Sequence, residues 1–344
     1  MAHSRLKFAV VGLGMASKPH LAALLQLSDI IEVAGAYSPS ADRRSTMSRK
    51  WNLPQFANLD EIVQADIDAA IIITPPNARI EIVRALASAG HAILMEKPIE
   101  RDLKRAVELV EICETAKVPL GIVLQHRFRA GAKAMAAKIH SGEVGEILSV
   151  RVALPWWREQ SYYDQPGRGT YEKDGGGVLI TQAIHVLDLM LSMTGQVSEV
   201  VALTGTTKRH RMEAENFATA GLRFENGALG SVFATTASFP GRAETLEVDC
   251  EHASMRLVAG ELTVQWRDGR VETIGEVTGT GGSSDPMDFP CDWHRELIQD
   301  FSASLKAGAP PLITGRMALD VHRLIHAIQT AAETGKVSRI EIET

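Results

Sequence analysis

The chain of 344 residues has few cysteines, few aromatic residues and no long run of one residue class. Its three cysteines, Cys113, Cys250 and Cys291, lie far apart and form no CxxC pair, so neither a disulfide framework nor a zinc site is indicated. They are typical of reduced thiols in a cytoplasmic protein. No apolar stretch approaches the roughly 20 residues of a membrane span, and no run of like charges indicates a nucleic-acid surface. The sequence therefore predicts no metal, membrane or nucleic-acid partner.

The rest of the composition is that of an ordinary globular protein, with 45% hydrophobic and 23% charged residues and a net charge of -6. The length favours two domains, each with its own core. Arg5 and Lys7 before an apolar run loosely resemble a signal peptide. The glycines after that run continue into a helical pattern, which favours a first strand and its turn.

From residue 5 to about 125, short apolar strands alternate with helical patterns. The strand candidates are rich in Val and Ile, as strands buried on both faces should be; they cover residues 7–11, 31–37, 69–73, 91–95 and 120–124. This alternation predicts an α/β domain with a Rossmann-type, doubly wound parallel sheet in residues 1–125.

The remaining residues, 126–344, have the pattern of an α+β domain with a large, mostly antiparallel open sheet. Alternating runs between 197 and about 275 contain two turn signals, Glu225-Asn226-Gly227 and Asp268-Gly269. Helical patterns accompany these runs at 130–141, 178–193, 292–306 and 316–334. We expect one face of this sheet to be open for packing.

A glycine turn follows the first strand and opens a helix, which is the context of a dinucleotide fingerprint. Gly12 permits the tight turn, and Gly14 lets the backbone approach a pyrophosphate. Met15, Ala16 and the small Ser17 lead into the helix, whose N-terminus offers N–H groups and a positive dipole end. The turn predicts NAD(P) as cofactor; an ordinary glycine turn is the alternative.

The acidic residue that usually follows the second strand and holds the ribose of NAD is absent. Ser38 and Ser40 stand in its place, with Arg43 and Arg44 close by. This removes the repulsion of a 2′-phosphate and offers cationic donors. The sequence therefore favours NADP, or tolerance of both cofactors, unless the arginines only form a solvated helix face.

The loop Thr74-Pro75-Pro76-Asn77 follows the third strand at its carboxyl end. We expect it to lie over the cofactor, between the phosphates and the nicotinamide. Asn77 could also cap the next helix.

Glu96-Lys97-Pro98 ends the fourth apolar run, where open α/β sheets bind ligands. A buried ammonium must be paired or lose its proton, so Lys97 is a candidate proton donor and acceptor. The alternative is a surface lysine in a strand-to-helix loop.

In order and spacing, these motifs resemble the glucose–fructose oxidoreductase and inositol dehydrogenase family (Gfo/Idh/MocA). The resemblance continues with Gln125-His126-Arg127-Phe128 and with residues 141–147 and 175–188, and it spans nearly the whole chain. It implies an NAD(P)-binding Rossmann domain in residues 1–125. Residues 126–344 would form a substrate-binding and oligomerisation domain, whose open sheet would build a homodimer or homotetramer.

The resemblance also implies roles for the Glu-Lys-Pro motif. In the family, its lysine touches both the nicotinamide and a substrate hydroxyl, which corresponds to Lys97. The peptide bond before the motif's proline is often cis, which corresponds to Lys97-Pro98. Glu96 would position the lysine or touch the nicotinamide.

A family histidine on a helix of the second domain corresponds to His185. Many members carry an Asp four residues earlier, but this chain has Thr181, followed by Gln182. Any mechanism that uses that Asp is therefore in doubt. Asp188, one turn along, could orient the imidazole. A packed helix histidine is the alternative.

Only 5% of the chain is aromatic, yet five aromatic residues fall within residues 155–171. Aromatic faces stack on sugar rings, and arginine and tyrosine donors bind hydroxyls. The predicted substrate residues are Arg127, Trp157, Arg158, Tyr163, Arg168, Thr181, Gln182 and His185. A dimer contact is the alternative for this loop. Together with Thr181 and Gln182, the loop resembles the branch that acts on sugars, sugar derivatives or sugar nucleotides.

The sequence thus predicts an NAD(P)-dependent oxidoreductase that transfers a hydride between nicotinamide and a secondary hydroxyl or keto carbon of a small polyhydroxy substrate. Lys97 and His185 would be its catalytic residues. Two alternatives stay open: redox-neutral glycoside cleavage or elimination with a cofactor that is regenerated in each cycle, and a non-catalytic cofactor-binding regulatory protein.

Overall fold

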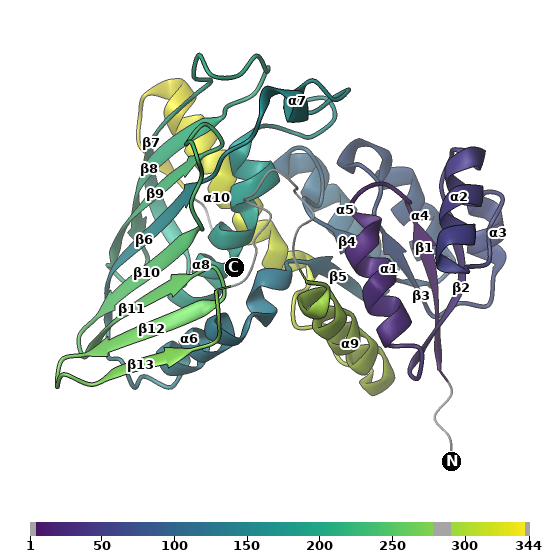
Figure 1. Ribbon diagram of the computed structural model, residues 1–344, viewed down its shortest axis with the longest axis horizontal. Coiled ribbons are helices and arrows are strands. Elements are labelled where there is room, and N and C mark those ends of the chain that lie inside the picture. Colours follow the sequence, from purple (N-terminus) through teal and green to yellow (C-terminus); the bar gives the residue numbers. More distant parts are fainter. Residues whose placement is uncertain (1–4, 278–289, 341–344) are drawn as a thin grey trace. The chain divides into compact units, whose positions relative to one another are not determined.

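The computed structural model describes residues 5–277 and 290–340, and the chain divides into two compact units (Figure 1). The first unit consists of Met1–Leu124 and Pro290–Leu319, and the second of Gln125–Phe289 and Asp320–Thr344. This division differs from the expected domains, 1–125 and 126–344, because Pro290–Leu319 groups with the first unit.

In the first unit, the described residues form a five-stranded parallel sheet in the order β2-β1-β3-β4-β5. Its strands are β1 (Leu6–Val11), β2 (Ile31–Tyr37), β3 (Ala69–Ile72), β4 (Ala92–Glu96) and β5 (Leu120–Val123). The last three strands are buried throughout, which explains their continuous apolar sequence. The strand order reverses between β1 and β3, and ligands of such sheets bind outside the carboxyl ends of the strands at this point. The predicted doubly wound sheet is confirmed.

Helices accompany this sheet along the chain. They are α1 (Ser17–Gln26), α2 (Ala41–Trp51), α3 (Leu59–Gln64), the 3-10 turn η1 (Pro76–Ala78), α4 (Ile80–Ser88), α5 (Leu103–Thr115) and α9 (Asp292–Ala307). Helix α9 lies beside α1 and also contacts β5 (Figure 1). Its Phe301 packs edge-on against Phe8 of β1, with ring centroids 6.3 Å apart. A late segment of the chain therefore completes the core of the first unit.

The second unit is built on a nine-stranded sheet, as far as the described residues go, in the order β13-β12-β11-β10-β6-β9-β8-β7-β14. The strands are β6 (Ile147–Pro155), β7 (Val197–Gly205), β8 (Phe217–Phe224), β9 (Leu229–Thr235), β10 (Thr245–Cys250), β11 (Ala253–Val258), β12 (Glu261–Trp266), β13 (Val271–Ile274) and β14 (Ser338–Arg339). Strand β6 pairs in parallel with β9, and the other described pairs are antiparallel. The predicted large, mostly antiparallel sheet is confirmed.

The expected turns join neighbouring strands of this sheet. Gly227 between β8 and β9 has φ 88°, and Gly269 between β12 and β13 has φ 92°. Glycine adopts this left-handed region without the steric penalty of a side chain. The two turn signals in the sequence therefore mark real hairpins.

The helical elements of the second unit are η2 (Gln125–Phe128), α6 (Ala130–His140), α7 (Gln160–Tyr163), the π-helix η3 (Leu179–Ala183), α8 (Ile184–Thr194) and α10 (Gly315–Thr334), which begins within the first unit. Helix α6 packs against β11 and β12, and α8 against β6 and β10. Alternate residues of β10 are buried, whereas Glu247 between them is partly exposed and pairs with Arg151 at 2.8 Å and Arg256 at 2.9 Å. One face of the sheet is thus apolar and the other carries charge.

Within residues 5–277 and 290–340, none of the helices combines the length and apolar character that crossing a bilayer requires.

Candidate functional site

The two glycines of the turn after β1 have different surroundings. Gly12 has φ 109°, and a Cβ there would lie 2.7 Å from the carbonyl carbon of Ile73 and 2.8 Å from the nitrogen of Thr74. The close approach of two backbone segments therefore requires a glycine. A Cβ at Gly14 would meet nothing within 4 Å among the described residues. Packing among the described residues therefore does not require a glycine at position 14. The open space beside Gly14 leaves room for a ligand.

Helix α1 begins directly after this turn, and no side chain caps its N-terminus at Ala16. Ser17 is fully buried and donates its hydroxyl to the carbonyl of Gly14 at 2.7 Å. Met15 is 49% exposed. A helix N-terminus of this kind attracts phosphate through its free N–H groups and its dipole.

The segment after β2 holds the predicted cofactor residues Ser38 and Arg43. Ser38 is buried, and its carbonyl accepts a hydrogen bond from the Arg44 guanidinium at 2.6 Å. The Ser40 hydroxyl caps α2 by accepting from the backbone nitrogen of Arg43 at 3.3 Å. Arg44 is thus used inside the loop, whereas the Arg43 side chain is exposed.

The loop after β3 brings a buried hydroxyl to the same edge of the sheet. Thr74 is 7% exposed, and its Oγ1 has no hydrogen-bond partner among the described residues. Pro75 and Asn77 are exposed. Asn77 lies in η1, and no side chain caps α4, whose N-cap is Arg79. The alternative role of Asn77 as a helix cap is therefore not observed.

Arg79 is a component of the site that the sequence analysis missed. It is 2% exposed, and its guanidinium donates to the carbonyl oxygen of Thr74 at 2.7 and 2.9 Å and to those of Glu96 and Pro98. Burial lowers the pKa of Arg79 to about 10, against the opposing charges of Glu96 and Glu100. Arg79 therefore ties the loop after β3 to the Glu-Lys-Pro turn after β4.

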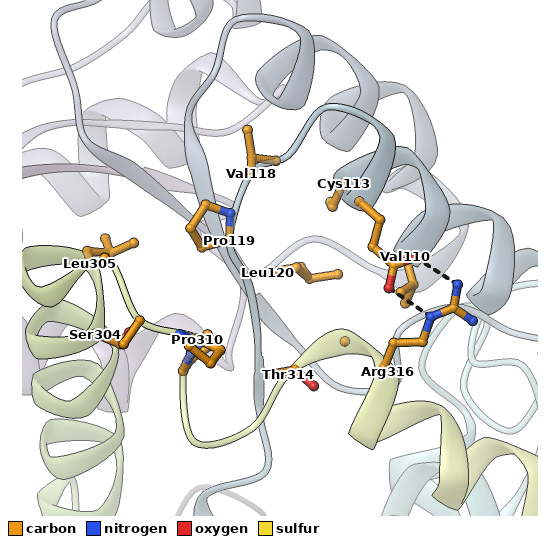
Figure 2. A pocket seen from close by; sticks show the side chains of 15 residues that line it. Val110, Cys113, Val118, Pro119, Leu120, Ser304, Leu305, Pro310, Thr314 and Arg316 are labelled. Carbon is orange, nitrogen blue, oxygen red and sulfur yellow. Dashed lines mark hydrogen bonds and ion pairs between the residues drawn. The ribbon is translucent and has the colours of Figure 1, made fainter. Parts of the chain in front are cut away.

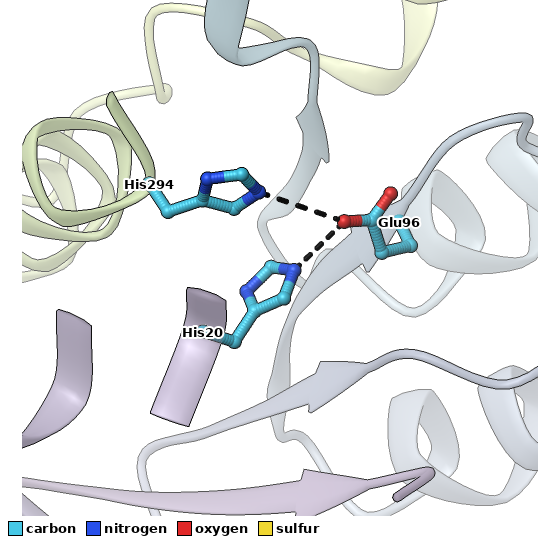
Figure 3. A group of neighbouring side chains, drawn as sticks. All are labelled: His20, Glu96 and His294. Carbon is cyan, nitrogen blue, oxygen red and sulfur yellow. Dashed lines mark hydrogen bonds and ion pairs between the residues drawn. The ribbon is translucent and has the colours of Figure 1, made fainter. Parts of the chain in front are cut away.

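The Glu-Lys-Pro turn itself has a cis bond between Lys97 and Pro98, as the family resemblance implied. Lys97 is partly buried, and its backbone nitrogen donates to Oε2 of Glu96 at 3.1 Å. Figure 3 shows the other carboxylate oxygen facing two histidines, with Oε1 2.7 Å from Nε2 of His20. Burial favours the protonated acid, but the hydrogen bond with His20 and nearby positive charge lower the pKa of Glu96 to about 2.

Three features of the first unit fit a dinucleotide. There is open space at Gly14, an uncapped N-terminus of α1, and a buried Thr74 hydroxyl without a partner in the described part of the chain. All belong to the loops that follow β1 and β3, on either side of the point where strand order reverses.

A separate pocket of about 300 Å³ lies at the amino-terminal end of β5 (Figure 2). It is lined by Val118, Pro119 and Leu120 at the start of β5 and by residues after α9. Arg316 and Glu114 form a bidentate ion pair there, with both distances 2.7 Å. The loops that carry the predicted cofactor residues follow the carboxyl ends of the strands, whereas this pocket lies at the start of β5. The pocket is therefore not part of the predicted cofactor site.

In the second unit, His185 lies on the first turn of α8 and stacks on His126, with ring centroids 4.5 Å apart and planes 21° apart. His126 comes from η2, and its Nε2 lies 2.6 Å from the guanidinium of Arg129. A guanidinium only donates, so Nε2 of His126 is the acceptor and the imidazole proton is on Nδ1. The predicted catalytic residue His185 is therefore stacked on the neutral imidazole of His126.

Asp188, which the sequence analysis considered as a partner of His185, is instead bound by Arg127. The guanidinium of Arg127 holds both carboxylate oxygens, at 2.5 and 2.8 Å, and both side chains are largely buried. Burial raises the pKa of Asp188, and the hydrogen bond from Arg127 opposes this effect. Arg127 is therefore engaged within the protein.

Thr181 and Gln182 lie in the π-helix η3, just before α8. The Thr181 hydroxyl is 2.6 Å from the carbonyl of Gly177 and 2.5 Å from Oε1 of Gln182. The start of this segment is held by Glu215, whose buried carboxylate accepts from the backbone nitrogens of Gly177 and Leu179, both at 3.1 Å. No sequence pattern pointed to Glu215, because it lies on a distant loop.

The aromatic loop after β6 is folded mainly onto its own unit. Arg158 is 4% exposed and lies over the ring of Trp156, at 5.2 Å from its centroid. The hydroxyl of Tyr163 is 2.6 Å from that of Thr236, and burial raises the pKa of Tyr163. Both side chains therefore pack within the unit.

Trp157 and Arg168 are the more accessible members of the loop. Trp157 is partly exposed, and the Arg209 guanidinium lies 4.2 Å from its ring centroid. Arg168 pairs with Asp174 at 3.4 Å and keeps 32% of its side chain exposed. Of the predicted substrate residues in this loop, these two present the most surface.

The predicted site residues therefore form two sets. The predicted cofactor residues of the first unit gather in the loops that follow β1, β2, β3 and β4. The predicted substrate residues of the second unit lie on η2, η3, α8 and the loop after β6. The expected pairing of Lys97 with His185 joins residues of different units and stays a prediction.

Two family models match the chain. One, described as an oxidoreductase family with an NAD-binding Rossmann fold, matches residues 6–123, and the other, described as the GFO/IDH/MocA C-terminal domain, matches residues 132–256. The chain belongs to the Gfo/Idh/MocA oxidoreductase family. This confirms the resemblance drawn from the motifs and makes the first unit an NAD-binding Rossmann domain.

Members of the Gfo/Idh/MocA family resemble the chain over different lengths. An uncharacterized oxidoreductase of Streptococcus pneumoniae is 30% identical over 62% of this chain, which spans about half of that relative (56%). Inositol 2-dehydrogenase of Rhizobium meliloti is 25% identical, over 97% of this chain and 99% of that protein. The structure of the WlbA dehydrogenase of Bordetella pertussis, in complex with NADH and UDP-GlcNAcA, is 27% identical and covers 99% of this chain and 100% of that one, with a TM-score of 0.85.

Proposed function

We propose that this Gfo/Idh/MocA protein transfers a hydride between a nicotinamide cofactor and a secondary hydroxyl or keto carbon of a sugar, polyol or sugar derivative. The observation that carries the proposal is the clustering of Gly12, Gly14, Thr74 and Lys97 in loops at the carboxyl ends of β1, β3 and β4. The similarity to inositol 2-dehydrogenase, and to a dehydrogenase bound to NADH and a sugar nucleotide, supports this substrate class.

The protein's part in this reaction is to orient the substrate and to move a proton. When bound, the cofactor supplies the hydride chemistry. In the oxidative direction the neutral amine of Lys97 would accept the hydroxyl proton, and in the reductive direction its ammonium would donate it. His185 would hydrogen-bond the same or a neighbouring hydroxyl. Arg79 would keep the backbone on both sides of Lys97 in place through the carbonyls of Glu96 and Pro98.

The substrate would be held mainly by the second unit. Trp157 offers a partly exposed aromatic face and Arg168 a partly exposed guanidinium, which suit the C–H face and the hydroxyls of a sugar. Thr181 and Gln182 would add polar contacts beside His185. Arg127 would act through Asp188, because its guanidinium is already bidentate there.

The main test is a panel of sugars, polyols and sugar nucleotides, each with NAD and NADP, in which the absorbance of reduced nicotinamide is followed. A dehydrogenase accumulates this absorbance. Consumption of substrate without any accumulation would favour redox-neutral cleavage or elimination. Failure of every polyhydroxy substrate would contradict the argument from the aromatic loop.

The role of Lys97 is tested by Lys97→Ala with the best substrate of that panel. We expect turnover to fall about 100-fold or more, as for loss of a general acid–base group, while NADH binding persists. Lys104→Ala, which changes an exposed lysine of α5, is the control. Turnover of Lys97→Ala within about tenfold of the original protein would exclude this role.

The cofactor site is tested by the two glycines. Gly12→Ala should destabilise the fold, because its Cβ would collide with the backbone of Ile73 and Thr74. Gly14→Ala should melt like the original protein but bind NADH less tightly. Equal melting temperatures together with equal NADH affinity in Gly14→Ala would remove Gly14 from the cofactor site.

We also propose that the site accepts NADP, with the exposed Arg43 near the 2′-phosphate. Arg43→Ala should then weaken NADP binding and leave NAD binding unchanged. A matched change at Arg44, whose guanidinium holds the Ser38 carbonyl, should affect both cofactors alike.

We further propose a homodimer or homotetramer through the open face of the nine-stranded sheet. Val201 and Leu203 of β7 and Leu229 of β9 are more than half exposed there, next to the charged residues Arg151 and Glu247 of β6 and β10. Leu203→Asp should yield a smaller species in light scattering if this face is the interface.

A further inference from the structure

His20, Glu96 and His294 form a buried polar group in the first unit, and they come from three elements that are far apart in the sequence (Figure 3). His20 lies on α1, Glu96 ends β4, and His294 lies in the first turn of α9. Their side chains are 0%, 12% and 2% exposed. The proposed binding and proton-transfer roles do not explain why two histidines should be buried here.

Both imidazoles point at one atom of Glu96. Nε2 of His20 lies 2.7 Å from Oε1, and Nε2 of His294 lies 3.9 Å from the same oxygen. The two rings meet edge to face, with centroids 4.8 Å apart and planes at 81°. The other carboxylate oxygen accepts the backbone N–H of Lys97 at 3.1 Å. The carboxylate therefore links the two helices to the backbone of Lys97.

Two members of the group, His294 and Glu96, have shifted pKa values. Burial lowers the pKa of His294 to about 3, so this ring is neutral near pH 7. Glu96, with a pKa of about 2, is ionised there. Other charged groups facing this region within the first unit are Lys97 and Arg79, with Glu100 near Arg79. In the described strand pairings, apolar Ile72 of β3 and Val123 of β5 lie beside this strand end.

Metal binding is the obvious rival, because the three ligand atoms lie within 4.8 Å of one another. However, the 2.7 Å contact between His20 and Glu96 is a direct hydrogen bond. A structural zinc ion needs four ligands, and among the described His, Cys, Asp and Glu residues no fourth joins this group. The hydrogen bond between His20 and Glu96 accounts for the shortest contact of the group without an ion.

We propose that His20 and His294 are positioning residues for the Glu-Lys-Pro turn: they keep the Glu96 carboxylate ionised and in one orientation, so that its second oxygen fixes the backbone of Lys97. This inference rests on the proposed role of Lys97 in proton transfer. The Glu96 carboxylate binds the backbone nitrogen of Lys97, and Arg79 binds the carbonyls of Glu96 and Pro98. Together they hold the peptide groups on both sides of Lys97.

The test is the pH profile of kcat/KM, with the panel substrate that is turned over fastest, for His20→Leu and His20→Gln. Without the donor to Oε1, burial becomes the main influence on Glu96 and raises its pKa, so the acidic limb should move up by about two pH units or more. We expect kcat/KM at pH 7 to fall by about 10-fold or more, a part of the ~100-fold or greater effect of the acid–base group itself. The glutamine amide can donate to the same oxygen and should restore most of both quantities.

His91→Leu is the matched control. His91 is also buried in the first unit, but it precedes β4 and bonds the carbonyls of Ile67 and Val63 at 3.1 and 3.0 Å. It should lower the melting temperature without moving the acidic limb. If His20→Leu does not fold, His294→Gln takes its place, because that ring faces the same oxygen.

Two results would overturn the inference. One is an acidic limb that moves by the same amount in His20→Leu and His91→Leu, or that moves in neither variant. The other is one equivalent of metal in the purified protein that is lost in His20→Leu. If Lys97→Ala keeps its turnover, the proposed role of Lys97 in proton transfer fails. If Lys97→Ala is inactive while the limb of His20→Leu stays in place, only the positioning role fails.

Discussion

Arg79 in the first unit and Arg129 in the second are both buried near the candidate sites, but they have different partners. Arg79 in the first unit is held by the carbonyl oxygens of Thr74, Glu96 and Pro98. Arg129 in the second unit is 1% exposed and is held by the carboxylate of Glu244 at 2.7 Å. Carbonyl dipoles stay neutral when the cation is removed, whereas a buried carboxylate is left as a bare charge. The same residue type therefore has a different energetic role in each unit.

The histidine pairs differ in the same way. His20 and His294 meet edge to face around the carboxylate of Glu96. His126 and His185 are stacked, and the neighbouring cation of Arg129 takes the outer nitrogen of His126. The first pair surrounds an anion, and the second borders a cation. The first arrangement suits holding the Glu96 carboxylate in one orientation, and the second suits packing the neutral His126 ring against His185.

The largest effect on stability is expected from Arg129→Met. The change leaves Glu244 buried without its cation, which should cost about 3–5 kcal/mol of unfolding free energy in urea titrations. Adding Glu244→Gln should recover part of the loss. Arg151→Met, at an exposed ion pair of β6, should stay within about 0.5 kcal/mol of the original protein. A loss below about 1 kcal/mol for Arg129→Met would remove the distinction between the two arginines.

Arg79→Met should have a smaller effect on stability, about 1–3 kcal/mol, because carbonyls lose their donor but no carboxylate loses its direct partner. It should also lower kcat, since the loops after β3 and β4 lose their link. Arg84→Met changes an exposed arginine of α4 and is the control for both measurements. Unchanged turnover in Arg79→Met would show that the link does not matter for the site.

Glu96→Gln and Asp188→Asn should respond to pH with opposite slopes. The folded pKa of Glu96 is about 2 against an ordinary 4.5, so its ionised form stabilises the fold above about pH 4.5, and this contribution is lost as the pH falls towards 2. The folded pKa of Asp188 is raised above 3.8 by burial, so its ionisation costs stability as the pH rises.

Melting temperatures between pH 3 and 7 measure this difference. The deficit of Glu96→Gln relative to the original protein should shrink towards low pH, and that of Asp188→Asn should shrink towards neutral pH. Parallel curves for the two variants would contradict the contrast between the carboxylates.

The smallest effect is expected from His126→Phe, which keeps an aromatic ring under His185 but removes the acceptor of Arg129. It should cost about 1 kcal/mol, the usual net value of one hydrogen bond. His126→Leu should cost more, because the stacked ring is lost as well. His140→Phe, on the exposed face of α6, is the control. Equal losses in the two His126 variants would show that stacking contributes nothing.

The sequence predicted those parts of the fold that depend on local pattern. Apolar runs predicted the five parallel strands, and Gly227 and Gly269 predicted two hairpins. The motif residues of the Rossmann domain could be found because each stands next to a strand end. Local pattern also gave the helix at 292–306, but a helical pattern does not say which sheet the helix covers.

The polar supports of the site could not be predicted for a physical reason. Arg79, His20, His294 and Glu215 are hydrophilic residues on helices or loops, and such residues are exposed by default. Their burial depends largely on partners that are distant in the sequence. Arg79 and Glu96 are 17 positions apart, and His294 and Glu96 are 198 positions apart. The π-helix around Thr181 and the parallel pairing of β6 with β9 likewise depend on contacts outside the local sequence.

The return of Pro290–Leu319 to the first unit has a consequence for biosynthesis. The Rossmann strands leave the ribosome early, but α9, with Phe301 for the core and His294 for Glu96, is translated only after the strands of the second unit. Domains of a multidomain chain usually fold in the order of their synthesis. Here the nascent first unit must wait, with the face beside α1 uncovered, until nearly the entire polypeptide has been made.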